Sequence, residues 1–221
     1  LGAEKFFDIK CRIGDLNPHA VVLVLTTKAL KWQGGALKEE IKNINTDALT
    51  KGFLNLEAHI RALSNFGIPI IGAINKYPSD SEIEIKMIEQ KCSALGIKCA
   101  VSNVREKGGA GGVDLANIVV NEASNSSTAL KFLYDLNNSP EEKIIAVSQK
   151  IYGAKAVVFS DSAIKELKLI NKLGFSNLPI CIAKTQFSLS DDPHKLGRPE
   201  NFDLHVKKIK ACPGAGFVVV F

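Results

Sequence analysis

Apolar and polar positions alternate along the chain in the pattern of repeated strand–helix units. Three short runs have the near-continuous apolar character of strands buried on both faces of a parallel sheet, and they span residues 21–27, 69–74 and 98–104. Apolar residues recur every three or four positions from residue 49 to residue 63, which predicts a helix closed by Gly67. Two more helices are predicted, one from the capping residues 79–81 to about Leu95 and one from Val113. We therefore predict an α/β protein with a doubly wound, mostly parallel sheet.

The second half of the chain continues the alternation and then changes character. Helices are predicted at residues 139–152 and 161–173, and strands at residues 156–159 and 178–183. Residues 202–210 alternate apolar and polar side chains, and a Pro-Gly turn leads into the apolar run 216–221, which predicts an antiparallel pair. The polar stretch 121–128 is the best candidate for a linker. We therefore expect two parts, residues 1–125 and a smaller α/β C-terminal subdomain, residues 126–221, that ends in an antiparallel strand pair.

Composition narrows the function classes. The net charge is +5, but Lys and Glu are interleaved without a basic block, which disfavours nucleic acid as a partner. No run reaches the ~18 apolar residues of a membrane span. The five cysteines form no Cys-x-x-Cys pair and the four histidines are scattered, so we expect buried free thiols and no metal cage. The chain begins without an initiator Met and ends inside a strand-like run, so we expect a fragment.

Ligands of parallel α/β sheets bind where the carboxyl ends of the strands meet loops and helix N-termini, so the loops after the predicted strands are candidate sites. The loop after Ile74 begins with Asn75-Lys76-Tyr77-Pro78. An Asn at a strand end can contact a nucleobase edge, and Asn-Lys is the start of the guanine-reading motif of GTPases. However, Pro78 stands where that motif has Asp, and a plain turn is the alternative interpretation.

A glycine-rich loop, Lys107-Gly-Gly-Ala-Gly-Gly, separates a predicted strand from a helix. Glycines there allow the backbone to approach a phosphate or a flat ring, although the spacing matches neither a Walker A nor a dinucleotide fingerprint. A tight turn is again the alternative. Tyr77 and Arg105, on neighbouring loops, both offer flat faces on which a ring could stack. The polar loop 184–192 could contact a substrate or another subunit, or form a capped turn.

Several segments together resemble formate–tetrahydrofolate ligases. Residues 24–35, V-L-T-T-K-A-L-K-W-Q-G-G, resemble the family signature V-A-T-[IV]-R-A-L-K-x-[HN]-G-G, and residues 177–199, N-L-P-I-C-I-A-K-T-Q-F-S-L-S-D-D-P-H-K-L-G-R-P, are the most specific match. Shorter matching segments lie at residues 1–12, 55–60, 73–82, 107–112 and 151–154. The resemblance therefore covers the chain from end to end.

The resemblance implies that formate, ATP and tetrahydrofolate give 10-formyltetrahydrofolate, ADP and phosphate through formyl phosphate. It implies a sheet of P-loop NTPase type, ATP with Mg²⁺ and tetrahydrofolate as small-molecule substrates, and a monovalent cation as a further candidate. The phosphate-binding P-loop of the family lies in an N-terminal half that these residues do not include, so the isolated chain should be inactive and that half is its expected partner. We also expect a homo-oligomer in the cytoplasm, with an organelle as the alternative location.

The resemblance also implies individual site residues. Tyr77 stands where the family stacks an aromatic ring on the pterin, Val101 stands at an apolar wall of that pocket, and Arg105 stands where many members have Trp. The candidate nucleotide or phosphate contacts are Asn75, Lys107, Gly108 and Gly109. Lys28 and Gln33 also depart from the signature. A non-catalytic homologue that acts as a binding or assembly module is therefore the alternative, and a GTPase-like module is a third hypothesis.

Overall fold

The computed structural model of the protein describes residues 2–125, 129–183, 185, 189, 190, 192 and 194–221. The chain forms two compact units. The first, the parallel-sheet unit, comprises Pro18–Ala129 and Leu196–Arg198, and the second, the mixed-sheet unit, comprises Leu1–Asn17, Leu130–Lys195 and Pro199–Phe221. The first 17 residues thus lie in the same compact unit as most of the C-terminal part, whereas the functional division into residues 1–125 and 126–221 stays a prediction.

The parallel-sheet unit contains the three strands predicted in the first half of the chain. They are β1 (Val21–Leu25), β2 (Ile70–Asn75) and β3 (Lys98–Ser102), all parallel, with β2 in the centre. Strand β1 ends two residues earlier than predicted, because the Thr26 side chain accepts a hydrogen bond from the backbone N–H of Ala29 at 3.1 Å and begins the next helix. The predicted parallel α/β architecture is confirmed.

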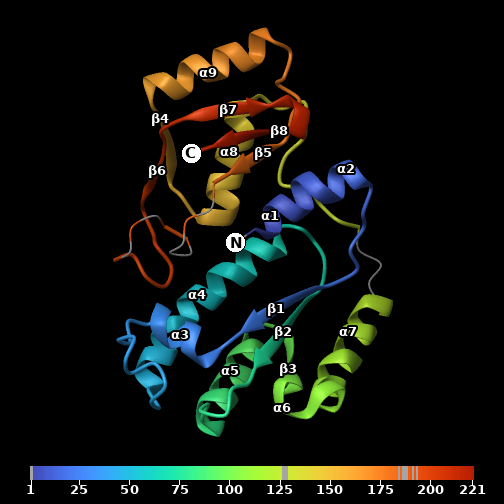
Figure 1. Ribbon diagram of the computed structural model, residues 1–221, viewed down its shortest axis with the longest axis vertical. Helices are drawn as coiled ribbons and strands as arrows, with labels where there is room; N and C mark the ends of the chain where they lie inside the picture. The colour runs from blue at the N-terminus through green and yellow to red at the C-terminus, as the bar shows by residue number, and fades with distance from the viewer. Residues whose placement is uncertain (1, 126–128, 184, 186–188, 191, 193) are drawn as a thin grey trace. The chain divides into compact units, whose positions relative to one another are not determined.

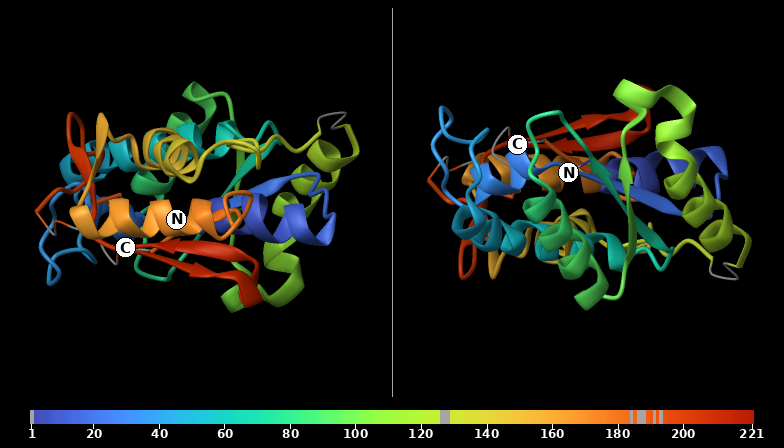
Figure 2. Two further views of the ribbon diagram at one scale, coloured as in Figure 1. Left: turned by 90° about the horizontal axis from the view of Figure 1, so that it is seen from above. Right: turned by 90° about the horizontal axis from the view of Figure 1, so that it is seen from below.

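Helices cover both faces of this sheet (Figures 1 and 2). They are α3 (Thr27–Gln33), α4 (Thr46–Ser64), α5 (Glu82–Ala94), α6 (Val104–Lys107), a 3₁₀ turn (Gly108–Gly112) and α7 (Val113–Asn125). Helices α4 and α5 bury Leu49, Leu56 and Ile88 against the sheet, and α7 lies on the side away from them. Helix α7 also corrects the predicted linker at 121–128: residues 121–125 are helical, and residues 126–128 lie outside the described part.

Two glycines bring α3 and α4 into close contact. A Cβ atom at Gly34 would lie 1.7 Å from the carbonyl oxygen of Ala48, and a Cβ atom at Gly52 would lie 1.9 Å from that of Leu30. No side chain fits at either position, because both neighbouring atoms belong to the backbone. The first glycine of the signature-like Gly34-Gly35 pair therefore has a packing role.

The mixed-sheet unit has an N-terminal helical stretch, two further helices and five strands among its described residues. Its helical segments are α1 (Ala3–Lys5), a π-helical turn (Phe6–Cys11), α2 (Arg12–Gly14), α8 (Pro140–Val147), a second π-helical turn (Ser148–Tyr152), α9 (Asp161–Lys172) and a 3₁₀ turn (Pro213–Ala215). Its strands are β4 (Ala156–Phe159), β5 (Ile180–Ile182), β6 (Asp203–Val206), β7 (Ile209–Cys212) and β8 (Phe217–Val220). Helix α9 packs on β4 and β7, and α8 packs on β5 (Figure 1).

The strand pairing of this unit confirms one part of the prediction and corrects another. Strands β7 and β8 form the predicted antiparallel pair, and β8 pairs in parallel with β5 on its other side. Strand β6, however, pairs in parallel with β4 in a separate two-stranded sheet. The alternation at residues 202–210 therefore covers two strands, which separate at Lys207 and Lys208, where each backbone N–H donates to the carbonyl oxygen of Phe221 at 2.7 and 3.2 Å.

Candidate functional site

The carboxyl ends of β1, β2 and β3 lie side by side at one edge of the parallel sheet. The register pairs Leu25 with Ile74 and Ile74 with Val101, so the loops that follow these residues are neighbours. The Lys76 N–H donates to the Ser102 carbonyl at 3.0 Å and ties two of these loops together. The fourth candidate loop follows β5 in the other unit, and its residues 184, 186–188 and 191 lie outside the described part.

A single carboxylate fixes the loop that carries Tyr77. The Asp80 side chain accepts a hydrogen bond from the Tyr77 N–H at 2.9 Å and one from the buried Thr27 hydroxyl at 2.6 Å. The Asp80 N–H donates back to the Tyr77 carbonyl at 2.9 Å. Asp80 therefore joins the β1 and β2 loops and sets the direction of the Tyr77 backbone. The sequence pattern indicated only a helix-capping role for this segment.

Two cations lie against the Tyr77 ring. The Lys28 Nζ lies 4.1 Å from the ring centroid and the Arg105 guanidinium carbon lies 5.8 Å from it, both within the range of a cation–π interaction. Lys28 comes from the start of α3 and Arg105 from α6. The structure thus brings Tyr77 and Arg105 together and adds Lys28. The only sequence signal for Lys28 was its departure from the signature Arg.

Val101 and Asn75 belong to the neighbouring strands β3 and β2. Val101 packs against the core cluster beneath α4 and α5. Asn75 is the last residue of β2, is half-buried, and is paired in register with Ser102. The folate contact of Val101 and the nucleotide contact of Asn75 remain predictions.

The glycine-rich loop divides into a packed part and an open part. A Cβ atom at Gly111 would lie 2.3 Å from the Asn103 carbonyl oxygen, so this glycine serves the tight turn. Gly108 has a φ of +55°, which favours glycine, and faces open space. Gly109 also faces open space but has no such φ, so neither packing nor backbone conformation accounts for it. The nucleotide or phosphate contact of Gly109, and that of the exposed Lys107, stay predictions.

This edge carries charges of both signs, because Glu82, Glu106 and Asp80 all act on the Lys76 ammonium. The Lys76 ammonium is hydrogen-bonded to Glu82, which raises the pKa of Lys76 and lowers that of Glu82. Lys28, Arg105 and Lys107 have no ion pair with a described acidic residue. Among the residues that the structure describes, no three His, Cys, Asp or Glu side chains form a group suited to a metal ion. The three cations Lys28, Arg105 and Lys107 are chemically able to pair with an anionic ligand.

These features define an α/β protein with a polar, charged edge at the carboxyl ends of three parallel strands. A family model described as formate–tetrahydrofolate ligase matches residues 1–221, and the chain belongs to this family. The resemblance inferred from the signature segments is thereby confirmed. The family joins formate to tetrahydrofolate with the use of ATP. Within the described residues, none of the helices combines the length and apolar character needed to cross a membrane.

Proposed function

We propose that the parallel-sheet unit forms the folate side of an enzyme that ligates formate to tetrahydrofolate through formyl phosphate. The observation that carries the proposal is Tyr77, whose backbone N–H is held by Asp80 and whose ring is contacted by Lys28 and Arg105 from the segments after β1 and β3. An aromatic ring held in this way suits a flat pterin, because offset stacking requires a ring of defined orientation.

In the proposed reaction, formate attacks the terminal phosphorus of ATP to give formyl phosphate and ADP, and the N10 amine of tetrahydrofolate then attacks the formyl carbon and releases phosphate. Tyr77, Val101 and Arg105 would hold and orient the folate. Lys28 and Lys107, with the open backbone at Gly108 and Gly109, would attract the phosphorylated partner. ATP with Mg²⁺ supplies the phosphoryl group and its charge neutralisation. The phosphate-binding residues would come from a P-loop outside these 221 residues, so we propose that this chain alone does not complete the reaction.

We also propose that the three parallel strands belong to a larger sheet of P-loop NTPase type. Strand β1 lies at the edge of the three-stranded sheet. Its apolar residues Val22 and Val24 are 42% and 63% exposed. A near-continuous β-branched run is typical of a strand covered on both faces, which supports additional structure over β1. The monovalent cation, the homo-oligomer and the cytoplasmic location remain predictions.

Substitution at Arg105 tests the stacking role. In the full-length protein, Arg105→Trp should tighten tetrahydrofolate binding roughly 2- to 10-fold, because a second aromatic wall adds stacking energy and buried apolar area. Tyr77→Leu should weaken binding by about tenfold. Arg61→Trp, at an exposed position on α4, is the matched control and should leave the affinity unchanged. Titration of tetrahydrofolate by calorimetry measures all three variants, and unchanged affinity in both Tyr77→Leu and Arg105→Trp would remove these residues from the site.

A non-catalytic homologue is the second candidate function. The observation that favours it is the position of Lys28 on the Tyr77 ring, where it occupies a face that a stacking ligand would use. The discriminating experiment is formation of 10-formyltetrahydrofolate by the full-length protein from formate, ATP and tetrahydrofolate. Absence of product with all three substrates present would favour the non-catalytic homologue, and turnover would exclude it.

A further inference from the structure

The hydrogen bond between Thr27 and Asp80 links two segments that are far apart in the sequence. Thr27 is the first residue of α3, is fully buried, and donates its hydroxyl hydrogen to the Asp80 Oδ1 at 2.6 Å. The Asp80 Oδ2 accepts a hydrogen bond from the Tyr77 N–H at 2.9 Å. One carboxylate therefore uses one oxygen to hold the start of α3 and the other to hold Tyr77.

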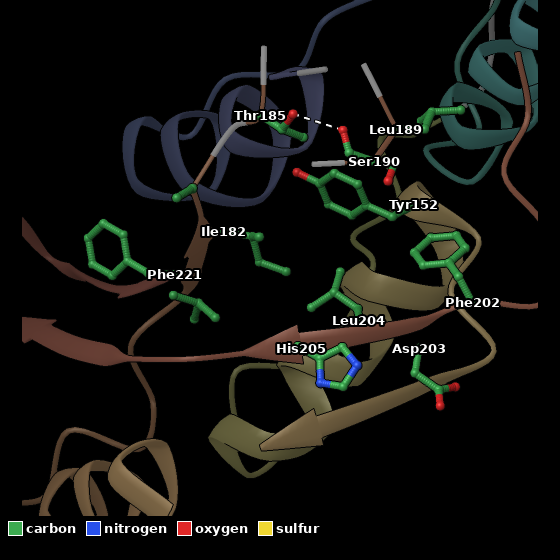
Figure 3. A pocket seen from close by; sticks show the side chains of 12 residues that line it. Tyr152, Ile182, Thr185, Leu189, Ser190, Phe202, Asp203, Leu204, His205 and Phe221 are labelled. Carbon is green, nitrogen blue, oxygen red and sulfur yellow. Dashed lines mark hydrogen bonds between the residues drawn. The ribbon is translucent and has the colours of Figure 1, made fainter. Parts of the chain in front are cut away.

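Two other threonine hydroxyls bond only to nearby residues. The Thr50 hydroxyl on α4 donates to the carbonyl oxygen of Thr46, four residues away. The Thr185 hydroxyl donates to the carbonyl oxygen of Ser190, five residues away, beside a cavity of the mixed-sheet unit (Figure 3). Such bonds connect a hydroxyl with its own stretch of backbone. The Thr27 hydroxyl instead reaches a carboxylate 53 residues away, so its bond fixes one segment against another.

The Tyr77 backbone is held from both of its polar groups. Besides the N–H bond, the Tyr77 carbonyl accepts a hydrogen bond from the Asp80 N–H at 2.9 Å, which closes a four-residue turn. Pro78 occupies the second position of this turn, where its fixed φ is favourable. The preceding Lys76 N–H donates to the Ser102 carbonyl at 3.0 Å. The direction of Tyr77 therefore depends on a short segment in which Asp80 makes two of the three bonds.

The Thr27–Asp80 bond also places a cation on the Tyr77 ring. Lys28 follows Thr27 directly, and its Nζ lies 4.1 Å from the Tyr77 ring centroid. The signature V-A-T-[IV]-R has Ile or Val where this chain has Thr27, and Arg where it has Lys28. An Ile or Val side chain has no hydroxyl to donate to Asp80. Two departures from the signature thus meet at Tyr77 and at the carboxylate that holds it.

We propose that Asp80 and Thr27 are positioning residues for tetrahydrofolate, and this inference rests on the proposed folate site at Tyr77. They keep the Tyr77 ring in the orientation on which the pterin stacks, and they do so without contacting the ligand. The physical reason is preorganisation: a ring that is already oriented does not have to be ordered when the ligand binds. Because both residues act through Tyr77, the loss of either should weaken binding no more than the loss of the Tyr77 ring itself.

The experiment measures tetrahydrofolate affinity of the full-length protein by calorimetry. Asp80→Ala should weaken binding about 5-fold and Thr27→Val about 2- to 3-fold, because these changes remove the hydrogen bonds that orient Tyr77. Thr27→Ser retains the hydroxyl and should restore the parent affinity. Thr50→Val, which removes the local hydroxyl bond on α4, is the matched control and should leave the affinity unchanged. If Asp80→Ala does not fold, Thr27→Val and Thr27→Ser carry the same test.

A double-mutant cycle separates a positioning role from general damage to the fold. In the Tyr77→Leu background, Asp80→Ala and Thr27→Val should cause no further loss of affinity, because no ring remains to be oriented. Losses as large as those in the parent background would show that Asp80 and Thr27 act by another route, and would overturn the inference.

The same cycle distinguishes this inference from the proposed function on which it rests. If Tyr77→Leu weakens binding but Asp80→Ala and Thr27→Val bind as the parent does, the folate site stands and the positioning role is wrong. If Tyr77→Leu itself leaves the affinity unchanged, the folate site at Tyr77 is wrong and the positioning role falls with it. An affinity of Thr27→Ser as low as that of Thr27→Val would also contradict the role of the hydroxyl.

Discussion

Each unit of this protein buries a lysine, and the two lysines are held in different ways. In the parallel-sheet unit, Lys31 and Glu84 form an ion pair at 3.0 Å, and both side chains are at most 2% exposed. The remaining hydrogen-bonding capacity is used as well, since Lys31 donates to the Asn43 carbonyl at 2.9 Å and Glu84 accepts from the Asn45 N–H at 2.9 Å. This pair joins α3, the loop before α4, and α5.

In the mixed-sheet unit, a buried lysine is held by backbone groups alone. Lys143 is fully buried and donates to the carbonyls of Ser176 at 2.6 Å and Leu178 at 3.2 Å. The described residues provide no carboxylate within ion-pair distance, and burial lowers the pKa of Lys143 to about 8. The comparison teaches that two hydrogen bonds to carbonyl groups do not replace an opposite charge, because carbonyl dipoles only partly offset the lost hydration.

The largest effect is expected where the buried pair is broken. Lys31→Met should lower the free energy of unfolding by about 3–5 kcal/mol, because it leaves the Glu84 carboxylate buried without a cation. The double variant Lys31→Met with Glu84→Leu should recover most of this loss, since two apolar side chains need no hydration. Urea unfolding of the single and double variants measures both. A double variant as unstable as the single one would show that packing, not charge, is what Lys31 supplies.

A smaller loss is expected from Lys143→Met in the mixed-sheet unit. Two hydrogen bonds to carbonyls disappear, but so does an uncompensated charge, and the net loss should be about 2 kcal/mol at pH 7. The folded-state pKa of about 8 lies below the unfolded value near 10.5, so the unfolded chain binds more protons between these values. The stability of the parent protein should therefore rise, relative to Lys143→Met, as the pH increases from 8 to 10.5. If the free energy of unfolding changed with pH in the same way in both proteins, the idea that the Lys143 charge is uncompensated would be wrong.

Asp8 is another buried charged group of the mixed-sheet unit, and its effect on stability can be measured at acidic pH. Its carboxylate accepts hydrogen bonds from the Leu133 N–H at 3.0 Å and from Arg12 at 3.2 Å, yet burial raises its pKa from 3.8 to about 6. The folded protein thus holds the proton more tightly than the unfolded chain. Stability should fall as the pH rises from about 4 to 6, by at most about 1.4 kcal/mol per pH unit. Thermal melts of Asp8→Asn across this pH range should not show that decrease in stability. If Asp8→Asn loses stability with pH as the parent protein does, another group is responsible for the decrease.

The smallest effects concern helix caps. Ser139 and Glu142 form a reciprocal capping box at the start of α8, whereas Ser81 caps α5 with a single hydrogen bond of 3.2 Å to the Ile83 N–H. Ser139→Ala should therefore cost about 1 kcal/mol, and Ser81→Ala should cost less. Chemical unfolding of both variants tests the order, which fails if Ser81→Ala is the more damaging change.

Local patterns predicted the elements better than their pairing. The helix predicted at residues 139–152 begins as expected, with Ser139 as the cap of α8, and the apolar run at residues 21–27 contains β1. The alternation at residues 202–210 could not show that β6 leaves the C-terminal hairpin to pair with β4. Alternation reports which face of a strand is buried, whereas the choice of neighbour depends on distant segments.

The candidate site shows the same limit. Tyr77 and Arg105 follow adjacent strands and could be expected to meet, but the contact of Lys28 with the Tyr77 ring spans 49 residues of sequence. Aspartate is a common turn residue, so its type alone indicates only a turn at Asp80. The hydrogen bond between Asp80 and Thr27 depends on the register of β1 against β2. A pattern of residue types contains no information on that register.

By itself, the sequence determined where strands and helices form, which glycines and caps end them, and to which family the chain belongs, because these depend on neighbouring residues and shared motifs. Only the tertiary structure decided the partner of β6, the cations on Tyr77, the balanced charge of Lys31 and the unbalanced charge of Lys143. The physical reason is that hydration, pairing and charge compensation are properties of groups brought together from distant parts of the chain.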